Sequence, residues 1–405
     1  MSNYRGPWFF FQLGHQDHRR CLQMAQAGHG RGAILSPTHL SPSSLRETAD
    51  SFRATGKDLL FDPQMFDPRN LPQREGEPAP DLAQTHDLSD INNAVATIDY
   101  YFRWQEELNV SSYLVPCPTA SPFTREWIRV ISRLNEQAYI WAAQNDPNRP
   151  RFSTIILPED VLATEDTRHE LLNSIVGFDT FNIEGFYVVF EAQTLMTNVD
   201  ALCGMLDFVF RLKQNQYSVL LGFADFWAML AFPFGLDGFA GGSWQRSRAF
   251  QANQWRGEQP RGPRRRAKRY RSSVLLADIR FPEEAELLRE VGMWSELNNS
   301  SPYASGLFSG ASPATIESSN GWREGISHQN TFWQFISMTD EFQPKTREER
   351  ILAVRSRLNT AEEFFSRAAR NRRQLQNNGS HLSIWRTAFE RYLFEVYDEL
   401  VDEFE

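Results

Sequence analysis

The sequence predicts an α/β protein built as a (β/α)8 barrel of the TIM type with a C-terminal, mainly helical extension. Short apolar runs recur along the first 290 residues, and each is followed by a stretch with helical character. Runs this apolar, without polar alternation, suit parallel strands that are covered on both faces. Alternating strands and helices indicate a parallel sheet, and eight such repeats within roughly 250 residues favour a closed barrel over an open sheet.

The expected strands are the apolar runs themselves, several of which end in Pro, Asp, Glu or Gly. In chain order they are GAILSP (32–37), DLLFDP (58–63), SSYLVPCP (111–118), FSTIILPED (152–160), GFYVVFE (185–191), YSVLLGF (217–223), GLDGFAGG (235–242) and SSVLLADIRF (272–281). Two assignments stay open. PWFFFQL (7–13) is also a strand candidate, and SSVLLADIRF belongs either to the barrel or to whatever follows it.

Between the strands lie helical patterns such as SPSSLRETADSFRATG, in which Ser44 and Glu47 are placed for a capping box and Gly56 for a stop. Beyond residue 290 a loop rich in Ser, Asn, Gly and Pro precedes helical segments around 328–341, 346–376 and 384–404. We therefore expect a barrel domain at 1–290, with a basic insertion at 256–271, and a C-terminal helical subdomain at 291–405.

Composition limits the classes of function. The chain has 405 residues, of which 41% are hydrophobic and 23% charged, and its net charge of −9 leaves nucleic-acid affinity to a local patch. Three distant cysteines argue against a disulfide framework and fit a reducing cytoplasm. The N-terminus lacks a secretory signal pattern, and the apolar run 219–235 is interrupted by Asp225 and Pro233, so we interpret it as buried core rather than a membrane span.

Carboxylates at the carboxyl ends of barrel strands are the candidate catalytic groups, because the functional face of a barrel lies there. Of these we select Asp62 and Glu191 as an acid and base pair, with Gln64 and Glu159 as substrate-binding residues. Glu191 follows five apolar residues and is therefore positioned by its strand. Asp62 precedes a proline and has the alternative role of a turn former, while Asp160 has that of a helix cap.

The stretch PFGLDGFAGGSWQRSR ends a strand with glycines, which allow close approach of the backbone to a ligand. Gly241, Gly242 and Ser243 are expected at the functional end as substrate-binding residues. The glycines either donate backbone N–H groups to a ligand oxygen or make room for Trp244. Asp237 lies at the opposite end of the strand, where a structural hydrogen-bonding role is favoured over a nucleophilic one.

A basic segment breaks the acidic composition. Residues 256–271 carry eight basic residues against one Glu, with Pro and Gly keeping them out of regular structure. Such a segment is either a polyanion contact or a solvated insertion. The candidate nucleic-acid-binding residues are Arg246, Arg248, Arg264, Arg265, Arg266, Lys268 and Arg269.

No metal site and no cofactor is expected. His15 and His18 have the HxxH spacing that can bind a metal on one helical turn, but a surface or structural role is favoured because further ligands are lacking.

Several segments resemble the tRNA-guanine transglycosylase family in order and spacing. LLFDPQMF is similar to the family's TDSGGFQ, LVPCPTASP to FDECPPYP, and GISHQNTFWQFI to the HNLxFYL helix, with His328 at the histidine. The resemblance implies a (β/α)8 barrel that exchanges a guanine for a 7-deazaguanine through an aspartate nucleophile, with Asp62 as the proton-handling aspartate.

The sequence departs from the family pattern at four places, one of which is LPED (157–160) in place of the QGG that would hydrogen-bond the guanine edge. Ala240 stands where the nucleophile belongs, Val115 stands at the base-recognition aspartate, and no cysteine lies beyond Cys203 to build the family's zinc site. Alanine cannot form a glycosyl ester, so the resemblance is stronger for the fold than for the chemistry.

Two hypotheses of function follow, and a third is less favoured. The chain is a divergent transglycosylase-like enzyme acting on a guanine- or 7-deazaguanine-type base or nucleoside in nucleic acid, in a modification or phage-defence setting. Alternatively, its catalysis is altered and the barrel serves as a binding module for tRNA, DNA or protein. The lesser reading is an unrelated flavin- or phosphate-binding barrel.

Overall fold

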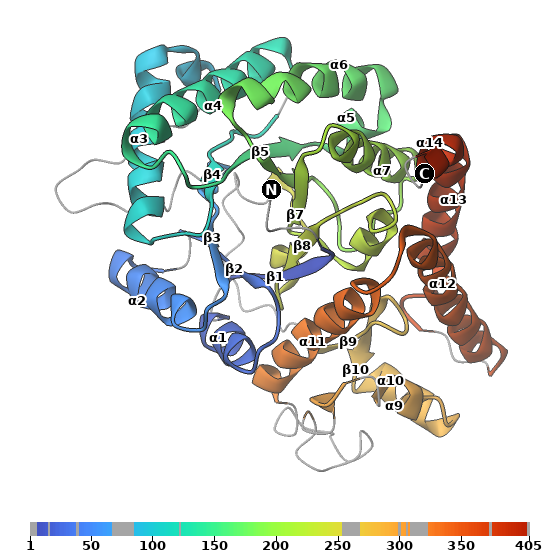
Figure 1. The fold of residues 1–405 in the computed structure, drawn as a ribbon. Coiled ribbons are helices and arrows are strands. Elements are labelled where there is room, and N and C mark those ends of the chain that lie inside the picture. The colour runs from blue at the N-terminus through green and yellow to red at the C-terminus, as the bar shows by residue number, and fades with distance from the viewer. Residues whose placement is uncertain are drawn as a thin grey trace.

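Eight parallel strands form a nearly closed barrel surrounded by helices, which confirms the expected fold class (Figure 1). The computed structural model describes residues 6–14, 17–37, 40–66, 85–120, 123–252, 268–298, 301–304, 307, 323–371 and 375–402. The strand order is β3-β2-β1-β8-β7-β6-β5-β4. The strands are β1 (Trp8–Gln12), β2 (Gly32–Leu35), β3 (Asp58–Phe61), β4 (Tyr113–Val115), β5 (Arg151–Leu157), β6 (Gly185–Phe190), β7 (Ser218–Gly222) and β8 (Gly238–Gly241).

The barrel closes on one side through the pairing of β1 with β8 and is joined on the other by a short seam. Phe10 pairs in parallel register with Ala240, and the same strand pairs with β2. Between β3 and β4 the ladder is replaced by Ser111, whose amide donates to the carbonyl of Leu59 at 2.7 Å. The Ser111 hydroxyl accepts from the amide of Leu59 at 2.9 Å. One serine therefore bridges the edge where the sheet would otherwise be open.

Two of the expected strand assignments are resolved by this ring. PWFFFQL supplies β1, the first barrel strand. SSVLLADIRF lies outside the barrel and supplies the turn and second strand of an antiparallel hairpin formed by β9 (Lys268–Ser272) and β10 (Ala277–Phe281). Its polar alternation, with Asp278 and Arg280 between buried residues, suits a hairpin with one solvated face.

Asp237 has the structural role that its position predicted. Its carboxylate accepts from Lys213 at 2.6 Å and from the amide of Val219 at 2.8 Å. It thereby ties the amino-terminal ends of β7 and β8 together.

The helices surround the barrel and pack apolar faces against it. The helix before β3 begins at Ser41, whose hydroxyl accepts from the amide of Ser44, so the N-cap lies three residues before the expected capping box of Ser44 and Glu47. The helices of eight or more residues up to β8 are α1 (His18–Gln26), α2 (Pro42–Arg53), α3 (Ile91–Glu107), α4 (Arg125–Asn145), α6 (Glu165–Ile175) and α7 (Val199–Gln214). Shorter elements in the same stretch are η2 (Thr85–Ser89), α5 (Glu159–Ala163), η3 (Val176–Phe181) and η4 (Phe226–Ala231).

The helix that covers β1 comes from beyond residue 290. Phe332 and Phe335 of α11 (Glu324–Phe342) contact Phe9 and Phe11, with ring centroids 5.2 to 6.4 Å apart. Between β8 and α11 the chain forms η5 (Gln245–Ser247), the β9–β10 hairpin, α9 (Glu283–Glu290) and α10 (Trp294–Asn298). These elements therefore lie between the last barrel strand and a helix that packs on the barrel.

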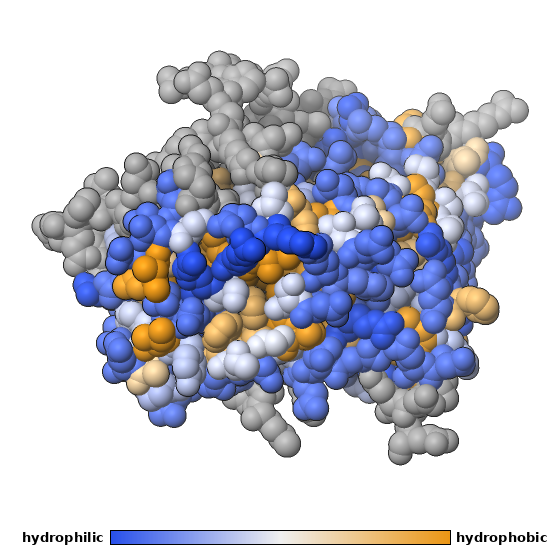
Figure 2. Space-filling model, turned by 90° about the horizontal axis from the view of Figure 1, so that it is seen from above, coloured by the Kyte–Doolittle hydropathy of each residue, from blue (hydrophilic) through white to orange (hydrophobic). Residues whose placement is uncertain are grey.

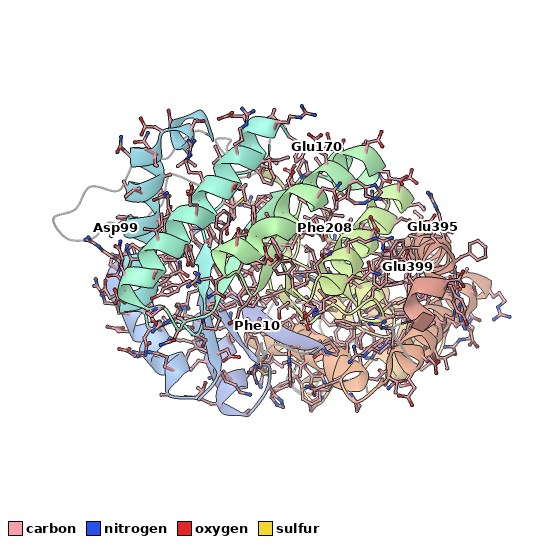
Figure 3. All side chains as sticks on the ribbon, turned by 45° about the horizontal axis from the view of Figure 1, so that its top comes forward. Phe10, Asp99, Glu170, Phe208, Glu395 and Glu399 are labelled. Atoms are coloured by element: carbon pink, nitrogen blue, oxygen red, sulfur yellow. The ribbon has the colours of Figure 1, made fainter. Side chains whose placement is uncertain are left out.

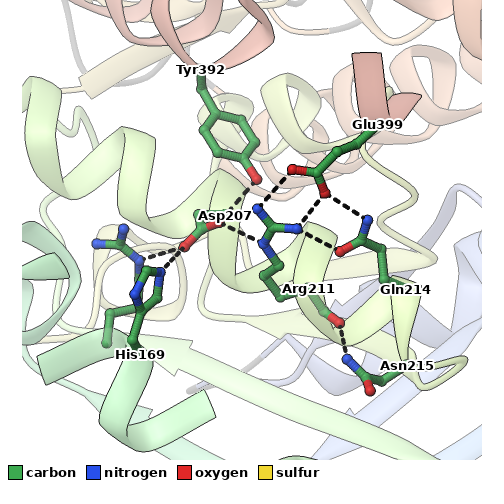
Figure 4. Close-up of polar contacts among 8 residues, drawn as sticks. His169, Asp207, Arg211, Gln214, Asn215, Tyr392 and Glu399 are labelled. Atoms are coloured by element: carbon green, nitrogen blue, oxygen red, sulfur yellow. Dashed lines mark hydrogen bonds and ion pairs between the residues drawn. The ribbon is translucent and has the colours of Figure 1, made fainter. Parts of the chain in front are cut away.

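Three helices follow α11 in the described part of the chain, and the middle one packs on α7. They are α12 (Arg347–Arg370), α13 (Ser380–Glu395) and α14 (Tyr397–Asp402). Asp207 of α7 is buried and accepts from Arg168 at 2.7 Å and from the Tyr392 hydroxyl at 3.1 Å (Figure 4). Arg211 binds Glu399 in the same network. Charged groups from α6, α7 and α14 are thus paired with one another, and α13 adds the hydroxyl of Tyr392 to the buried Asp207.

Phe10 and Phe208 lie in the interior, whereas Asp99 and Glu170 lie at the periphery (Figure 3). The face seen from above carries apolar patches between hydrophilic side chains (Figure 2). The run 219–235 is buried almost throughout, as expected of core. Among the described residues, the helices are too short or too polar to cross a bilayer.

Candidate functional site at the mouth of the barrel

A buried carboxylate lies at the carboxyl end of β3. Asp62 is 2% exposed, accepts from the amide of Gln64 at 3.0 Å and accepts from the Tyr187 hydroxyl at 3.3 Å. Burial raises the pKa of Asp62 to about 6, although both hydrogen bonds act in the opposite direction. Asp62 therefore forms the turn that its Asp-Pro sequence predicted and is also a carboxyl group that titrates near neutral pH.

Tyr187 reaches Asp62 from β6, on another side of the barrel. Its hydroxyl also lies 3.2 Å from Oε1 of Gln12 on β1, so its one proton has two acceptors. The phenol lies over Gly222 of β7, where a Cβ atom would come within 2.2 Å of the hydroxyl oxygen. Glycine at 222 leaves the space that the ring occupies.

The side-chain amides of two glutamines complete the cluster. Gln64 has a φ of 50°, a left-handed conformation that non-glycine residues rarely adopt, and its Oε1 accepts from Ser36 at 2.7 Å. Gln12 is 1% exposed, and its Nε2 has no hydrogen-bond partner among the described residues. Turning this amide over would only exchange which of its two atoms is left unpaired.

Tyr101 and Cys117 lie close enough to Asp62 for its charge to act on them. The Tyr101 hydroxyl is buried and without a hydrogen-bond partner among the described residues. Burial raises the pKa of the Tyr101 hydroxyl and of the Cys117 thiol, and the charge of Asp62 raises both further. Neither group ionises near neutral pH, so Asp62 is the titrating member of the cluster.

An unpaired polar atom in the interior costs free energy, on the order of 1 to 3 kcal/mol, and such atoms are uncommon in native structures. Unpaired Gln12 Nε2 and Tyr101 hydroxyl groups beside a carboxyl of raised pKa are typical of a site that binds a polar ligand. We call Asp62, Tyr187, Gln12, Gln64 and Ser36 the mouth cluster.

The other predicted acids of the mouth lie outside this cluster. Glu191 follows β6, is half-buried, and accepts from the amide of Ala252 at 2.6 Å. Glu159 is half-buried in the first turn of α5. The geometry brings Gln64 to Asp62 but gives Glu191 a backbone partner instead.

The glycine-rich end of β8 is shaped by neighbouring backbone. The amide of Gly242 donates to the carbonyl of Ser247 at 2.9 Å, and a Cβ at this position would come within 2.2 Å of the Ser247 side chain. A Cβ at Gly241 would come within 2.8 Å of the carbonyl of Ala224. The N–H of Gly242 is therefore already used, and the space is taken by Ser247 rather than by Trp244.

Ser243 belongs to a second polar group beside the mouth. Its hydroxyl donates to the buried carboxylate of Asp17 at 2.6 Å, and Nδ1 of His328 lies 3.1 Å from the same carboxylate. Arg20 lies 2.8 Å from that nitrogen. Because the carboxylate stands between the serine and the histidine, the histidine does not act on the serine hydroxyl. The group joins the loop after β1 to β8 and α11.

The candidate nucleic-acid-binding residues differ in burial, and some of them lie outside the described residues. Arg248 is 5% exposed and lies 3.7 Å from Asp225 and 3.6 Å from Asp278, so it faces the interior. Arg246 and Arg269 are exposed, and Lys268 is half-buried. Arg264, Arg265 and Arg266 lie outside the described residues.

Tyr187, Gln12 and Ser36 were missed by the reasoning from sequence. Each interrupts or ends an apolar strand: Gln12 in WFFFQL, Tyr187 in GFYVVF and Ser36 after GAIL. A polar atom at an inward strand position was the available signal. The register that brings Tyr187 to Asp62, Gln12 to Tyr187 and Ser36 to Gln64 was not readable from one strand alone.

The described residues hold no group of three or more His, Cys, Asp and Glu side chains that could bind a metal. A surface groove of about 350 Å³ lies between α3 and α4, where it is lined by Asp99, Arg103, Glu106, Glu107, Trp141 and Asn145. It is separate from the mouth cluster.

Fold and site together define a (β/α)8 barrel with a hairpin insertion after its last strand and a polar cluster at its mouth. No protein-family model and no curated protein matches the chain. Among solved structures, a GH10 xylanase from Bispora sp. MEY-1 covers 58% of this chain and 83% of its own, at 12% identity and a TM-score of 0.40. The carboxyl transferase domain of Rhizobium etli pyruvate carboxylase covers 97% and 77%, at 10% identity and a TM-score of 0.37. These similarities concern the barrel and carry no argument about activity.

Proposed function

We propose that the chain binds a purine-type base, free or within a nucleoside or nucleic acid, at the mouth cluster, with Asp62 giving or taking a proton. The observation that carries the proposal is the buried Asp62 carboxyl of raised pKa close to Nε2 of Gln12, which has no hydrogen-bond partner among the described residues. Carboxyl and amide groups match the alternating donors and acceptors on the edge of a purine. A carboxyl group that titrates near pH 6 is suited to proton transfer at neutral pH.

The finer proposal is a guanine- or 7-deazaguanine-type base, which the resemblance to transglycosylases favours. Residue 240 faces Phe10 across the β1–β8 pair and is alanine, so it offers no carboxylate to attack a sugar carbon. What the chain's own residues support is recognition and protonation of the base. Base exchange in a modification or phage-defence setting remains the proposal of the resemblance alone.

The test is equilibrium binding of guanine, 7-deazaguanine and, as a non-purine, cytosine, measured by calorimetry between pH 5 and pH 8. We expect purine binding that changes across pH 6 and weakens at least about tenfold in Asp62→Asn and in Gln12→Leu, the loss of one buried hydrogen bond to a charged or polar partner. Asp160→Asn, an exposed carboxylate at the same end, is the matched control and should bind as wild type. Absence of binding to either purine, or equal affinity in all variants, would refute the proposal.

A second candidate function, polyanion binding, is favoured by the β9–β10 hairpin. Arg269 lies directly opposite Arg280, both are exposed, and neither side chain has an ion-pair partner among the described residues. Like charges directly opposite one another destabilise a sheet. A phosphate between the two guanidinium groups would remove this repulsion.

The salt dependence of nucleic-acid binding tests this candidate. We expect the double variant Arg269→Ala, Arg280→Ala to bind RNA and DNA more weakly and to reduce the slope of log affinity against log salt by about 2, one unit for each phosphate contact. Arg129→Ala, an exposed arginine on α4, serves as control. A slope unchanged in the double variant would count against the hairpin as the contact.

We also propose a reducing compartment such as the cytoplasm. The support is that Cys21, Cys117 and Cys203 are all buried thiols without a disulfide.

A further inference from the structure

Three phenylalanines from separate segments meet over the barrel mouth. The ring of Phe66 lies 4.6 Å from that of Phe250 and 5.9 Å from that of Phe223, and Phe223 lies 5.7 Å from Phe250. Phe66 follows β3, Phe223 follows β7, and Phe250 lies beside the end of β6, so their contact spans the ring of strands. All three are at most 4% exposed. We call them the aromatic cover.

Two residues in the segments that form the cover have a left-handed backbone conformation. Gln64, two residues before Phe66, has a φ of 50°, and Phe223 itself has a φ of 51°. Residues other than glycine rarely adopt this conformation, and it persists only where its surroundings hold it. They are typical of ligand clamps and switch regions rather than of ordinary core.

Glu191 holds the third ring in place. The amide of Ala192 donates to the carbonyl of Phe250 at 2.9 Å, and the amide of Ala252 donates to the Glu191 carboxylate at 2.6 Å. The carboxylate is half-buried, so water can replace the Ala252 amide when the contact breaks. A single contact of this kind contributes little beside the stability of a whole domain, so it can break without unfolding the protein.

We propose that the aromatic cover opens to admit a ligand to Asp62 and that Glu191 is the latch that keeps it closed. The inference rests on the proposed function, because a site for a base requires a route to Asp62, which is 2% exposed. It gives Glu191 a positioning role, through the segment that carries Phe250, in place of direct contact with the reacting atoms. It also explains why a carboxylate placed by a buried strand points to a backbone amide.

Cys117 is a built-in reporter of opening. It lies beyond the end of β4 near Asp62, is 2% exposed, and reacts with a thiol reagent only when the mouth is open or the protein is unfolded. Cys21, on the buried face of α1 and 0% exposed, reports unfolding alone. The ratio of their labelling rates therefore separates local opening from global unfolding.

The experiment is labelling of the full chain by a small methanethiosulfonate, with modification at each cysteine followed by mass spectrometry. We expect Glu191→Ala to speed labelling of Cys117 by about tenfold, the equivalent of 1.4 kcal/mol, while Cys21 stays at the wild-type rate. Glu191→Gln, which keeps an acceptor oxygen, should restore the slow rate to within about threefold. Asp160→Ala is the matched control for removal of a carboxylate at the same end of the barrel.

Phe250→Ala provides a second variant that opens the cover without touching the latch, and it too should expose Cys117 selectively. Wild-type labelling of Cys117 in both variants, or labelling of Cys21 in step with Cys117, would overturn the proposal. The outcome is independent of any purine. Selective labelling with no purine binding would refute the proposed function and leave the cover standing.

Discussion

At the scale of single residues, the mouth cluster contains a carboxyl group whose burial disfavours its ionised form. Asp62 is excluded from water and accepts hydrogen bonds from Gln64 and Tyr187. Its pKa is raised to about 6, so at neutral pH the folded state carries a charge that would be less costly in the unfolded chain. A group retained at such a cost is typical of a functional site.

Replacing Asp62 by asparagine is expected to stabilise the protein at high pH. The folded state binds more protons than the unfolded state between about pH 4 and pH 6, so ionisation of Asp62 lowers stability as pH rises through that window. The shift from 3.8 to about 6 corresponds to a gain of at most about 3 kcal/mol for Asp62→Asn at pH 8, falling toward zero below pH 4. Urea unfolding of both proteins at pH 8, 6 and 4 measures it. A gain independent of pH would show that the charge is not its cause.

At the scale of secondary-structure elements, the packing of the C-terminal helix α13 includes a buried histidine. His381 of α13 is 1% exposed and packs against Trp385 and Phe365, with ring centroids 4.9 and 6.3 Å away. Neither ring nitrogen has a hydrogen-bond partner among the described residues. Burial lowers the pKa of His381 to about 4, so the ring is neutral in the folded protein.

Acidification should therefore loosen α12 and α13. The unfolded chain takes up a proton on His381 near pH 6.5 whereas the folded chain does so near pH 4, so this residue makes stability fall as pH drops through that window. The contribution is about 2 kcal/mol between pH 7 and pH 5, from the 1.36 kcal/mol per pKa unit. We expect His381→Leu to lose this part of the pH dependence of stability, measured by urea unfolding at pH 7 and pH 5. The same pH dependence in wild type and variant would contradict the role of His381.

These elements show which parts of the molecule local pattern could predict. Apolar runs identified β2 to β8 because a strand covered on both faces has no polar alternation. Apolar content alone could not decide whether 272–281 was a barrel strand, because a hairpin with one solvent-exposed face also contains apolar residues. Of the mouth cluster, Asp62 and Gln64 were predicted from their place after a strand, whereas Gln12 and Tyr187 depend on which strands lie opposite one another in the ring.

At the scale of the whole molecule, the barrel and the C-terminal part are one body. Phe335 of α11 contacts Phe9 of β1, Phe239 of β8 and Phe226 of η4. Helix α11, which was expected in the C-terminal subdomain, thus packs directly on the barrel. The described elements between β8 and α11 follow the last barrel strand and precede a helix that packs on the barrel.

Thermal unfolding should accordingly be a single transition, seen alike by far-UV circular dichroism and tryptophan fluorescence. Phe335→Ala should lower the stability of the whole molecule by about 3 to 5 kcal/mol and move that one transition. Phe394→Ala is the control, since this ring is 86% exposed and its loss should cost less than about 0.5 kcal/mol. An early transition of the C-terminal part, with the barrel still folded, would contradict the single body.

From its residue pattern the chain specifies an alternation of buried strands and helices, the barrel it implies, and an acid at the end of β3. Hydrophobicity and strand period are properties of neighbouring residues, so they can be read along the chain. The contact of that acid with Tyr187, the contact of Phe66 with Phe250, and the packing of α11 on β1 each join segments more than 100 residues apart. Those contacts depend on how the sheet closes and in which register, which no local stretch encodes.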